Sequence, residues 1–396
     1  MNAPLPDIDT LPLDAIDVSE ATLYQQDIWR PYFARLRAED PVHWSENQLF
    51  GGFWSVTRFE DITAVDGNHE AFSSEPAITI GDYGDDLPVR QFIAMDPPIH
   101  DVQRAAVQGV VAPRNLADLE GLIRQRVADI LDHLPTGETF NWVEEVSINL
   151  TTQMLATIFD FPFEDRHKLP YWSDMATSLP EATGSDGDVD ERTAALQECL
   201  GYFTELWHQR KNNPPDTMDL ISLLATNPKT RDMVDDPLEY LGNLILLIVG
   251  GNDTTRNSIT GGVLALNQHP DEYAKLKADP SLIPSMVSEI IRWQTPLMHM
   301  RRIATRDVEL GGKTIRQGDK VVMWYLSGNH DETAIDRPND FIIDRKNPRY
   351  HLSFGFGIHR CMGNRLAELQ LRILWEELLA RFETIEVLEK PERTYS

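Results

Sequence analysis

Apolar side chains recur every three to four residues over most of this chain, which is the spacing of helices with one buried face. The pattern is mainly helical over 115–210, where a polar loop rich in Gly, Asp and Pro at 179–190 separates two amphipathic segments. Residues 237–270 make one long, largely apolar stretch, and residues 364–382 make a strongly amphipathic one. We therefore expect a mainly α-helical fold with a long central helix.

Apolar and polar residues alternate in only two regions, as they do in strands with one buried face. Residues 42–57 predict a hairpin with a Gly-Gly pair near its turn. Residues 308–324 predict short strands around a second Gly-Gly pair, which marks a tight turn. The strands therefore add small β-sheets to the helical fold.

Composition and charge narrow the class of protein. The stretch 1–20 is acidic and contains prolines, so we expect a flexible tail there; no linker divides 21–396, which we expect to be one domain. Two cysteines are too few for a disulfide framework and favour a reducing compartment. No signal peptide and no apolar run near the roughly 20 residues of a membrane helix occur, so we expect a cytoplasmic protein without a transmembrane segment. The net charge of −27 argues against nucleic acid as a partner.

One of the two cysteines, Cys361, lies in the stretch "SFGFGIHRCMG", directly before the last amphipathic segment. A helix N-terminus at this point favours the thiolate form of a cysteine. The glycines of the stretch, Gly363 among them, allow tight turns and the close approach of a flat group, and Phe354 can cover the sulfur. This combination is typical of a thiolate that binds the iron of a large planar cofactor. A buried structural cysteine is the plainer alternative.

The complete pattern Phe-x-x-Gly-x-His-x-Cys-x-Gly is expected by chance on the order of once in ten thousand such chains, or more rarely. With it the chain resembles the cytochrome P-450 superfamily of haem-thiolate monooxygenases, in its bacterial soluble form. The resemblance implies haem b with Cys361 as the iron ligand. It also implies the family fold, an α-rich triangular prism with haem between a long central helix and the helix after the cysteine loop. The other cysteine, Cys199, has no such context and is expected to pack within a helix.

The centre of the predicted long helix combines small and polar residues. Leu246, Gly250, Asp253 and Thr254 fall on one helical face, and an acid beside an alcohol can relay protons. Taken alone, the pattern also fits a core helix with a glycine kink and a salt-bridged Asp. The family motif Gly-x-Asp/Glu-Thr matches Gly251, Asp253 and Thr254. By resemblance, Gly251 leaves space for dioxygen, Thr254 holds it by a hydrogen bond, and Asp253 helps to deliver protons.

Glu289 and Arg292 lie three residues apart on one predicted helix face and match the buried Glu-x-x-Arg pair of the family. A third member normally comes from a Pro-x-Arg-Phe-like segment downstream. Here that segment is "DRPNDF", with Asp340 where Arg or His would stand. Either Arg337 or Arg345 substitutes, or the triad is reduced, and the sequence leaves these options open.

The two propionates of haem need cationic partners. Four residues match family positions for this role: His100, Arg104, Arg302 and His359. Each of them alone also fits a solvated surface charge, but together they form the expected set.

Monooxygenation needs two electrons per turnover, and the chain has no motif for flavin, nicotinamide or an iron–sulfur cluster. We therefore expect a separate [2Fe-2S] ferredoxin with a ferredoxin reductase and NAD(P)H. Residues 345–372 hold six basic side chains and one acid, Glu368, for a net charge of +5. A basic surface there would steer an acidic ferredoxin, and the alternative is that these charges are solvated or bind propionates.

More narrowly, "GGNDTTRNS", "EIIRWQTPLMHMRR" and "WYLSGNHDE" resemble the bacterial hydroxylases of alkane and fatty-acid chain ends. This implies terminal (ω) hydroxylation of medium-chain n-alkanes or fatty acids with dioxygen. Terminal C–H bonds are stronger than internal ones, so such an enzyme needs a narrow channel that presents only the chain end. The candidate substrate-pocket residues are Leu246, Gly250, Ile93, Met95, Leu297 and Met298.

Two further expectations concern segments near this pocket. The loop at 179–190 is expected to form a mobile lid. The family usually continues beyond "KPERTYS" into a C-terminal hairpin whose turn enters the substrate pocket, so we expect that hairpin to be absent.

Other functions fit the sequence less well. A cysteine-ligated haem sensor or electron carrier has no need of a proton relay, and a peroxygenase usually lacks the acid–alcohol pair at Asp253 and Thr254. A helical protein without a cofactor would be colourless. Among monooxygenases, a terpene or a steroid is the alternative substrate.

Overall fold

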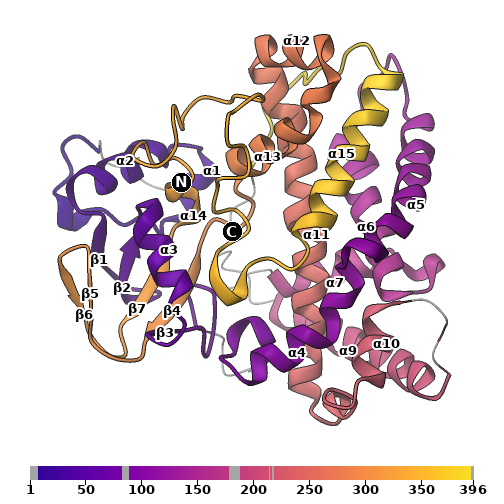
Figure 1. The fold of residues 1–396 in the computed structure, drawn as a ribbon, viewed down its shortest axis with the longest axis horizontal. Helices are drawn as coiled ribbons and strands as arrows, with labels where there is room; N and C mark the ends of the chain where they lie inside the picture. Colours follow the sequence, from indigo (N-terminus) through magenta and orange to yellow (C-terminus); the bar gives the residue numbers. More distant parts are fainter. Residues whose placement is uncertain (1–7, 83–88, 178–187, 214, 216–217, 394–396) are drawn as a thin grey trace.

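The computed structural model describes residues 8–82, 89–177, 188–213, 215 and 218–393 (Figure 1). Helices make up most of the molecule, and the sheets gather at one end with the first three helices, so the expected mainly α fold with small sheets is confirmed. The α-helices are α1 (Ala21–Gln25), α2 (Arg30–Glu39), α3 (Phe59–Gly67), α4 (Ile99–Val107), α5 (Pro113–Asp132), α6 (Asn149–Phe159), α7 (Lys168–Thr177), α9 (Asp188–Asn212), α10 (Leu220–Thr226), α11 (Pro237–Gln268), α12 (Pro270–Ala278), α13 (Ile283–Gln294), α14 (Tyr325–Gly328) and α15 (Asn364–Arg381).

The larger sheet has five strands in the order β1-β2-β7-β4-β3. Only β2 and β7 pair in parallel, and the other neighbours are antiparallel. A separate two-stranded ribbon, β5-β6, turns at Gly311 and Gly312, whose φ angles of +56° and +74° favour glycine. Both predicted strand regions are thereby confirmed. The strands are β1 (Val42–Asn47), β2 (Gly51–Val56), β3 (Phe72–Ser73), β4 (Met300–Ala304), β5 (Val308–Leu310), β6 (Lys313–Ile315) and β7 (Lys320–Met323).

The predicted long central helix is the 32-residue α11, which runs unbroken through its glycines. Asp236 caps its first turn by accepting a hydrogen bond from the backbone N–H of Glu239, and Pro237 occupies the first helical position, where no backbone donor is needed. Helices α6, α7, α13 and α15 pack around α11, and their apolar faces share the main hydrophobic core. No helix among the described residues has the length and apolar character needed to cross a membrane.

The cysteine loop lies where the helical and sheet-bearing parts of the molecule meet (Figure 1). It follows the sheet, α14 and a long irregular segment, and it leads directly into α15. Helix α15 packs against α5 and α13, while α3 contacts both α14 and the short 3₁₀ turn Gly357–His359 inside the loop. The loop is therefore held from two sides.

The structure bears on one of the two expectations about flexible segments. The predicted loose tail is wrong for residues 8–20, because Ile16 and Val18 are buried in the core beside the sheet and Arg35 donates hydrogen bonds to the carbonyls of Ile8 and Leu11, both at 2.6 Å. Residues 1–7 lie outside the described part. Most of the predicted lid at 179–190 also lies outside it, and Asp188 already begins α9.

Candidate active site

Cys361 lies at the end of its loop, two residues before the cap residue of α15, and its side chain is exposed. Its backbone N–H donates to the carbonyl of Phe354 at 2.8 Å, which closes the loop. The Phe354 ring packs against the main core, and a Cβ on Gly363 would have no neighbour within 4 Å. The thiol thus has free space beside it on a rigid turn.

Opposing effects act on the Cys361 thiol. Although one side of Cys361 is exposed, the protein that surrounds the thiol desolvates it and raises its pKa. The N–H groups of Gly363 and Asn364 and the positive charges of Arg104 and Arg360 lower the pKa without fully compensating. The helix start therefore favours the thiolate as expected, but it does not produce one by itself. A bound cation would supply the missing stabilisation, because a coordinated thiol loses its proton.

The other two glycines of the loop have a different neighbour from the one expected. Gly355 and Gly357 take φ angles of +66° and +68°. On the side where a Cβ would stand, both glycines meet Asp66 of α3 and not the space for a flat cofactor. A Cβ on Gly357 would lie 2.3 Å from the Asp66 carbonyl oxygen. These glycines therefore let the loop approach α3 closely.

The two adjacent glycines of α11 differ in their surroundings. Gly250 is exposed, and a Cβ added to it would meet nothing within 4 Å. Gly251 packs against α6, where a Cβ would lie 2.8 Å from Cδ2 of Leu155. A side chain at Gly251 would therefore collide with α6, and among the described residues the open position of the pair is Gly250. The dioxygen role that the resemblance implies for Gly251 stays a prediction. The Thr254 hydroxyl donates to the Gly250 carbonyl at 3.0 Å, so the alcohol belongs to the same part of the helix.

Asp253 is held in a polar network that reaches α7. Its carboxylate lies 2.9 Å from a nitrogen of Arg256 and accepts hydrogen bonds from Asn252 at 3.1 Å and from the Ser173 hydroxyl at 3.4 Å. Arg256 also contacts Asp174 at 3.2 Å. Burial raises the pKa of Asp253, Arg256 lowers it and Asp174 raises it, with a net rise. The pKa of the Asp253 carboxyl group is thus closer to neutral pH than that of an exposed Asp.

The four candidate propionate partners gather near the cysteine. The rings of His100 and His359 lie 4.3 Å apart. The charges of Arg302 and Arg104 both act on His359, whose pKa burial and these charges lower to about 2. Arg104 also donates to the carbonyl of Arg360, the residue before the cysteine, at 2.5 Å. The structure therefore brings together residues that are up to 259 positions apart in the sequence.

Three buried nitrogens in this cluster have no hydrogen-bond partner among the described residues: Nε2 of His100 and both ring nitrogens of His359. Leaving buried polar atoms unpaired is costly, so such atoms mark a place where a ligand supplies the partner. Positive charge and unpaired nitrogens beside an accessible thiol fit a cofactor with an iron and two carboxylates. The described residues hold no group of three or more His, Cys, Asp or Glu side chains that suits a bare metal ion.

The family model for cytochrome P-450 matches residues 112–395. The chain belongs to the cytochrome P-450 family. Members are monooxygenases with cysteine-ligated haem, so this P-450 is a haem-thiolate oxidoreductase. Linalool 8-monooxygenase of Pseudomonas putida is 34% identical over 95% of this chain and 94% of its own. The methyl-branched lipid omega-hydroxylase of Mycobacterium bovis is 32% identical over 92% and 87%. The solved cytochrome P-450-153 from Novosphingobium aromaticivorans is 44% identical, with a TM-score of 0.89 over 96% and 95%.

The candidate residues of this P-450 fit its cofactor. Haem would bind through the Cys361 sulfur, with the cluster of His100, Arg104, Arg302 and His359 beside its carboxylates. When bound, haem supplies the iron at which dioxygen is activated. The open side of Gly250 and the Thr254 hydroxyl lie on the same turn of α11 and would supply the space and the hydrogen-bonding group for that oxygen chemistry.

The six candidate substrate residues are distributed over different parts of the core. Leu246 and Gly250 lie one turn apart on α11, and Leu246 is partly exposed. Ile93 and Leu297 are partly buried against the core around the sheet, and Met298 packs against the core beside the N-terminal helices. Met95 is almost fully buried in the main core, so it is the least suited of the six to touch a ligand.

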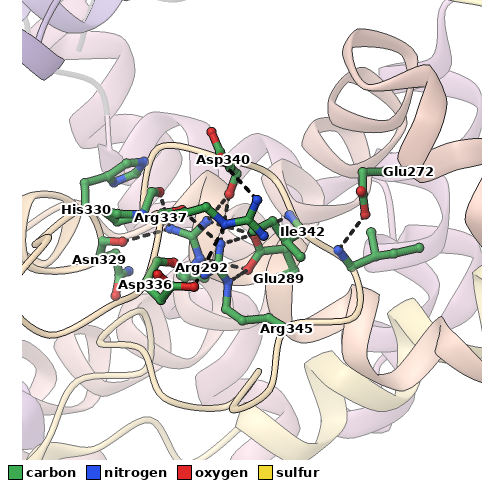
Figure 2. A network of polar contacts seen from close by, with 12 residues as sticks. Glu272, Glu289, Arg292, Asn329, His330, Asp336, Arg337, Asp340, Ile342 and Arg345 are labelled. Carbon is green, nitrogen blue, oxygen red and sulfur yellow. Dashed lines mark hydrogen bonds and ion pairs between the residues drawn. The ribbon is translucent and has the colours of Figure 1, made fainter.

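The Glu-x-x-Arg pair forms as expected and has a third member (Figure 2). Glu289 and Arg292 are completely buried, and their closest atoms are 2.8 Å apart. Arg345 adds hydrogen bonds to Glu289 at 3.0 and 3.1 Å. Arg337 is largely exposed, and its ion pairs with Asp336 and Asp340 are long, at 3.9 and 3.7 Å. Of the options left open by the sequence, Arg345 is therefore the one that is realised.

This assignment changes the expected basic surface. Arg345 forms an ion pair with Glu289, and Arg372 forms ion pairs with Glu120 and Glu376. Neither positive charge is therefore available to a partner protein. Lys346, Arg360 and Arg365 are exposed, as is Arg349, which makes a surface pair with Glu368 at 2.8 Å. The net charge of the segment therefore overstates the charge available to a partner.

Several residues that support the site were not predicted from the sequence. Arg256 and Ser173 hold Asp253, and Asp66 and Tyr325 meet beside Arg302. Arg256 is the exception that spacing could have revealed, because it lies three residues after Asp253 on the same helix. The others come from distant segments.

Proposed function

We propose that this P-450 hydroxylates the terminal carbon of linear aliphatic chains, either n-alkanes or fatty acids. One face of α11 carries this proposal. The face is open at Gly250, and one helical turn earlier it presents the partly exposed apolar side chain of Leu246. An apolar surface that leads to a single open position at Gly250 suits an aliphatic chain that enters with its terminal carbon first. The omega-hydroxylase among the relatives supports oxidation at a chain end.

In this proposal Cys361 is the iron ligand, and His100, Arg104, Arg302 and His359 bind the haem carboxylates. The Thr254 hydroxyl, which donates its proton to the Gly250 carbonyl, offers its oxygen as a second hydrogen-bonding group to the reacting oxygen. Asp253 carries the protons, while the Ser173 hydroxyl and the Arg256 guanidinium hold its carboxylate in place. The raised pKa of Asp253 supports this role, because a proton carrier works best when its pKa is near the working pH.

The electron donor in this proposal is a separate ferredoxin that docks near the cysteine loop. The exposed basic residues Lys346, Arg349, Arg360 and Arg365 support this position. An acidic partner would be repelled by most of a chain whose net charge is −27 and attracted here.

A terpene is the second candidate substrate, because linalool 8-monooxygenase is similar over nearly the whole chain. Substrate-induced shifts of the haem spectrum separate the two candidates. We expect medium-chain alkanes and fatty acids to give saturable shifts at lower concentration than linalool or a steroid. Tighter binding of linalool than of any linear chain would overturn the proposed substrate class.

A further inference from the structure

A buried carboxylate outside the expected motifs contacts both a candidate propionate partner and the cysteine loop. Asp66 lies near the end of α3 and is 3% exposed. Its Oδ1 accepts a hydrogen bond from Arg302 at 2.7 Å. Its Oδ2 accepts hydrogen bonds from the Tyr325 hydroxyl and from the backbone N–H of Phe356, both at 2.8 Å. One side chain thus joins a candidate propionate partner to the cysteine loop.

The packing around Asp66 makes this connection rigid. Gly355 and Gly357 of the loop lie directly against it, with ideal Cβ positions 3.4 Å from the Asp66 Oδ2 and 2.3 Å from its carbonyl oxygen. Phe356 stands between these glycines, and its ring lies 3.5 Å from the ideal Cβ position of the α3 residue Gly67. The loop can therefore occupy this position only while α3 and the Asp66 carboxylate stay in place.

The charges around Asp66 explain why the carboxylate is present in the core. Arg302 is 1% exposed, and a buried guanidinium needs an anionic partner. Asp66 provides that charge on one side, and Arg302 also donates to the carbonyl of Arg301 at 2.8 Å. These two contacts fix the orientation of the guanidinium, whose charge reaches His359.

We propose that Asp66 is a positioning residue for the haem: one of its oxygens orients Arg302, and the other holds the loop that carries Cys361. The inference rests on the proposed assignment of Arg302 and Cys361 to haem. Residues that orient direct ligands commonly change cofactor affinity by about 10- to 100-fold when they are replaced. Asp66 itself does not touch the reacting atoms in this proposal.

The test compares three variants of the haem-loaded protein. Asp66→Asn keeps the shape of the side chain but removes its charge and places an NH₂ group against one of the donors. Tyr325→Phe removes only the hydroxyl bond to Asp66. Asp331→Asn is the matched control for the stability of α3, because Asp331 is equally buried and accepts hydrogen bonds from the backbone N–H of Phe59, at the opposite end of α3 from Asp66, and from Thr333.

The readouts are the rate of haem transfer to apomyoglobin, the Soret position of the reduced carbonyl complex and the urea midpoint of unfolding. We expect Asp66→Asn to release haem about tenfold faster or more, with part of the carbonyl complex losing the thiolate band. Tyr325→Phe should show a smaller effect in the same direction. Asp331→Asn should lower the urea midpoint yet keep haem release and the Soret band unchanged.

Equal haem release from Asp66→Asn and Asp331→Asn would overturn the inference. If Asp66→Asn does not fold, Tyr325→Phe decides, and wild-type haem release in that variant contradicts the proposal. Arg302→Gln separates the two assumptions. If Arg302→Gln releases haem faster while Asp66→Asn does not, only the role of Asp66 is wrong. If Arg302→Gln releases haem at the wild-type rate, Arg302 does not belong to the haem site either.

Discussion

Arg345 donates two hydrogen bonds to the Glu289 carboxylate, at 3.0 and 3.1 Å, and shares that carboxylate with Arg292. Both arginines also donate to the backbone carbonyl of Asp340, at 3.2 Å from Arg292 and 2.9 Å from Arg345. Burial alone would raise the pKa of Glu289, but the two guanidinium groups outweigh burial and lower it. The triad therefore fastens α13 to the irregular segment that leads to the cysteine loop.

Arg345→Met tests this triad. We expect a loss of about 3–5 kcal/mol in the free energy of unfolding, because the variant removes one of the two positive charges that stabilise the buried Glu289 carboxylate. Arg337→Met is the control, since Arg337 is exposed and its pairs are long, and it should stay within about 0.5 kcal/mol of the wild type. Urea unfolding of the haem-loaded proteins measures both. Equal stability of the two variants would remove Arg345 from the triad.

Thr254→Ala tests the alcohol on α11. Without the hydroxyl we expect haem and substrate to bind normally while reducing equivalents are diverted to hydrogen peroxide. A lost hydrogen bond of this kind costs about 1–3 kcal/mol in the affected barrier. Thr254→Ser keeps the hydroxyl and should retain the coupling of NADH use to product. The relay role is wrong if Thr254→Ala is coupled as well as the wild type.

Two substitutions around Asp253 should move the pH dependence of product formation in opposite directions. Arg256→Gln removes a positive charge 2.9 Å from the carboxylate, so the pKa of Asp253 rises and the midpoint set by this group moves to higher pH. Asp174→Asn removes a negative charge that raises the same pKa, so the midpoint moves to lower pH. Product formation measured across pH checks both shifts. Midpoints that move together, or not at all, contradict the assignment of the proton path to Asp253.

Charge reversal tests the docking of ferredoxin. Lys346→Glu combined with Arg349→Glu should slow ferredoxin-driven reduction by about tenfold at low salt and weaken its salt dependence. Haem content and the substrate-induced spectral shift should be unchanged. The control with an equal charge change is Lys313→Glu with Arg316→Glu, at the β5-β6 ribbon far from the cysteine loop in Figure 1. If both double variants are reduced equally fast, the ferredoxin docks elsewhere.

Features whose residues are close along the chain could be predicted from the sequence. The cysteine loop, the Glu289–Arg292 pair and the two Gly-Gly turns are local patterns, and periodicity located α11 and α15 to within two residues. Gly250 and Gly251 show the limit of this approach. They are adjacent and chemically identical, and only the packing of α6 against one of them decides which leaves open space.

Long-range partners were not accessible in the same way. Asp66 and Arg302 are 236 residues apart, and an acid near the end of a short helix carries no signal of its distant partner. Arg345 could be narrowed to one of two candidates only because the family pattern requires a basic residue in that region. The packing of the N-terminal segment could not be predicted, because Ile16 and Val18, which pack into the core, are isolated apolar residues in an acidic stretch.

The central claim is that this P-450 oxidises the end of a linear chain at a haem held by Cys361. Product regiochemistry tests it most directly: n-octane and a medium-chain fatty acid are converted with a surrogate ferredoxin and reductase, and the products are separated by gas chromatography. We expect the terminal alcohol to predominate with both substrates, and no product from Cys361→Ala. Mainly subterminal alcohols, or equal turnover by Cys361→Ala, would contradict it.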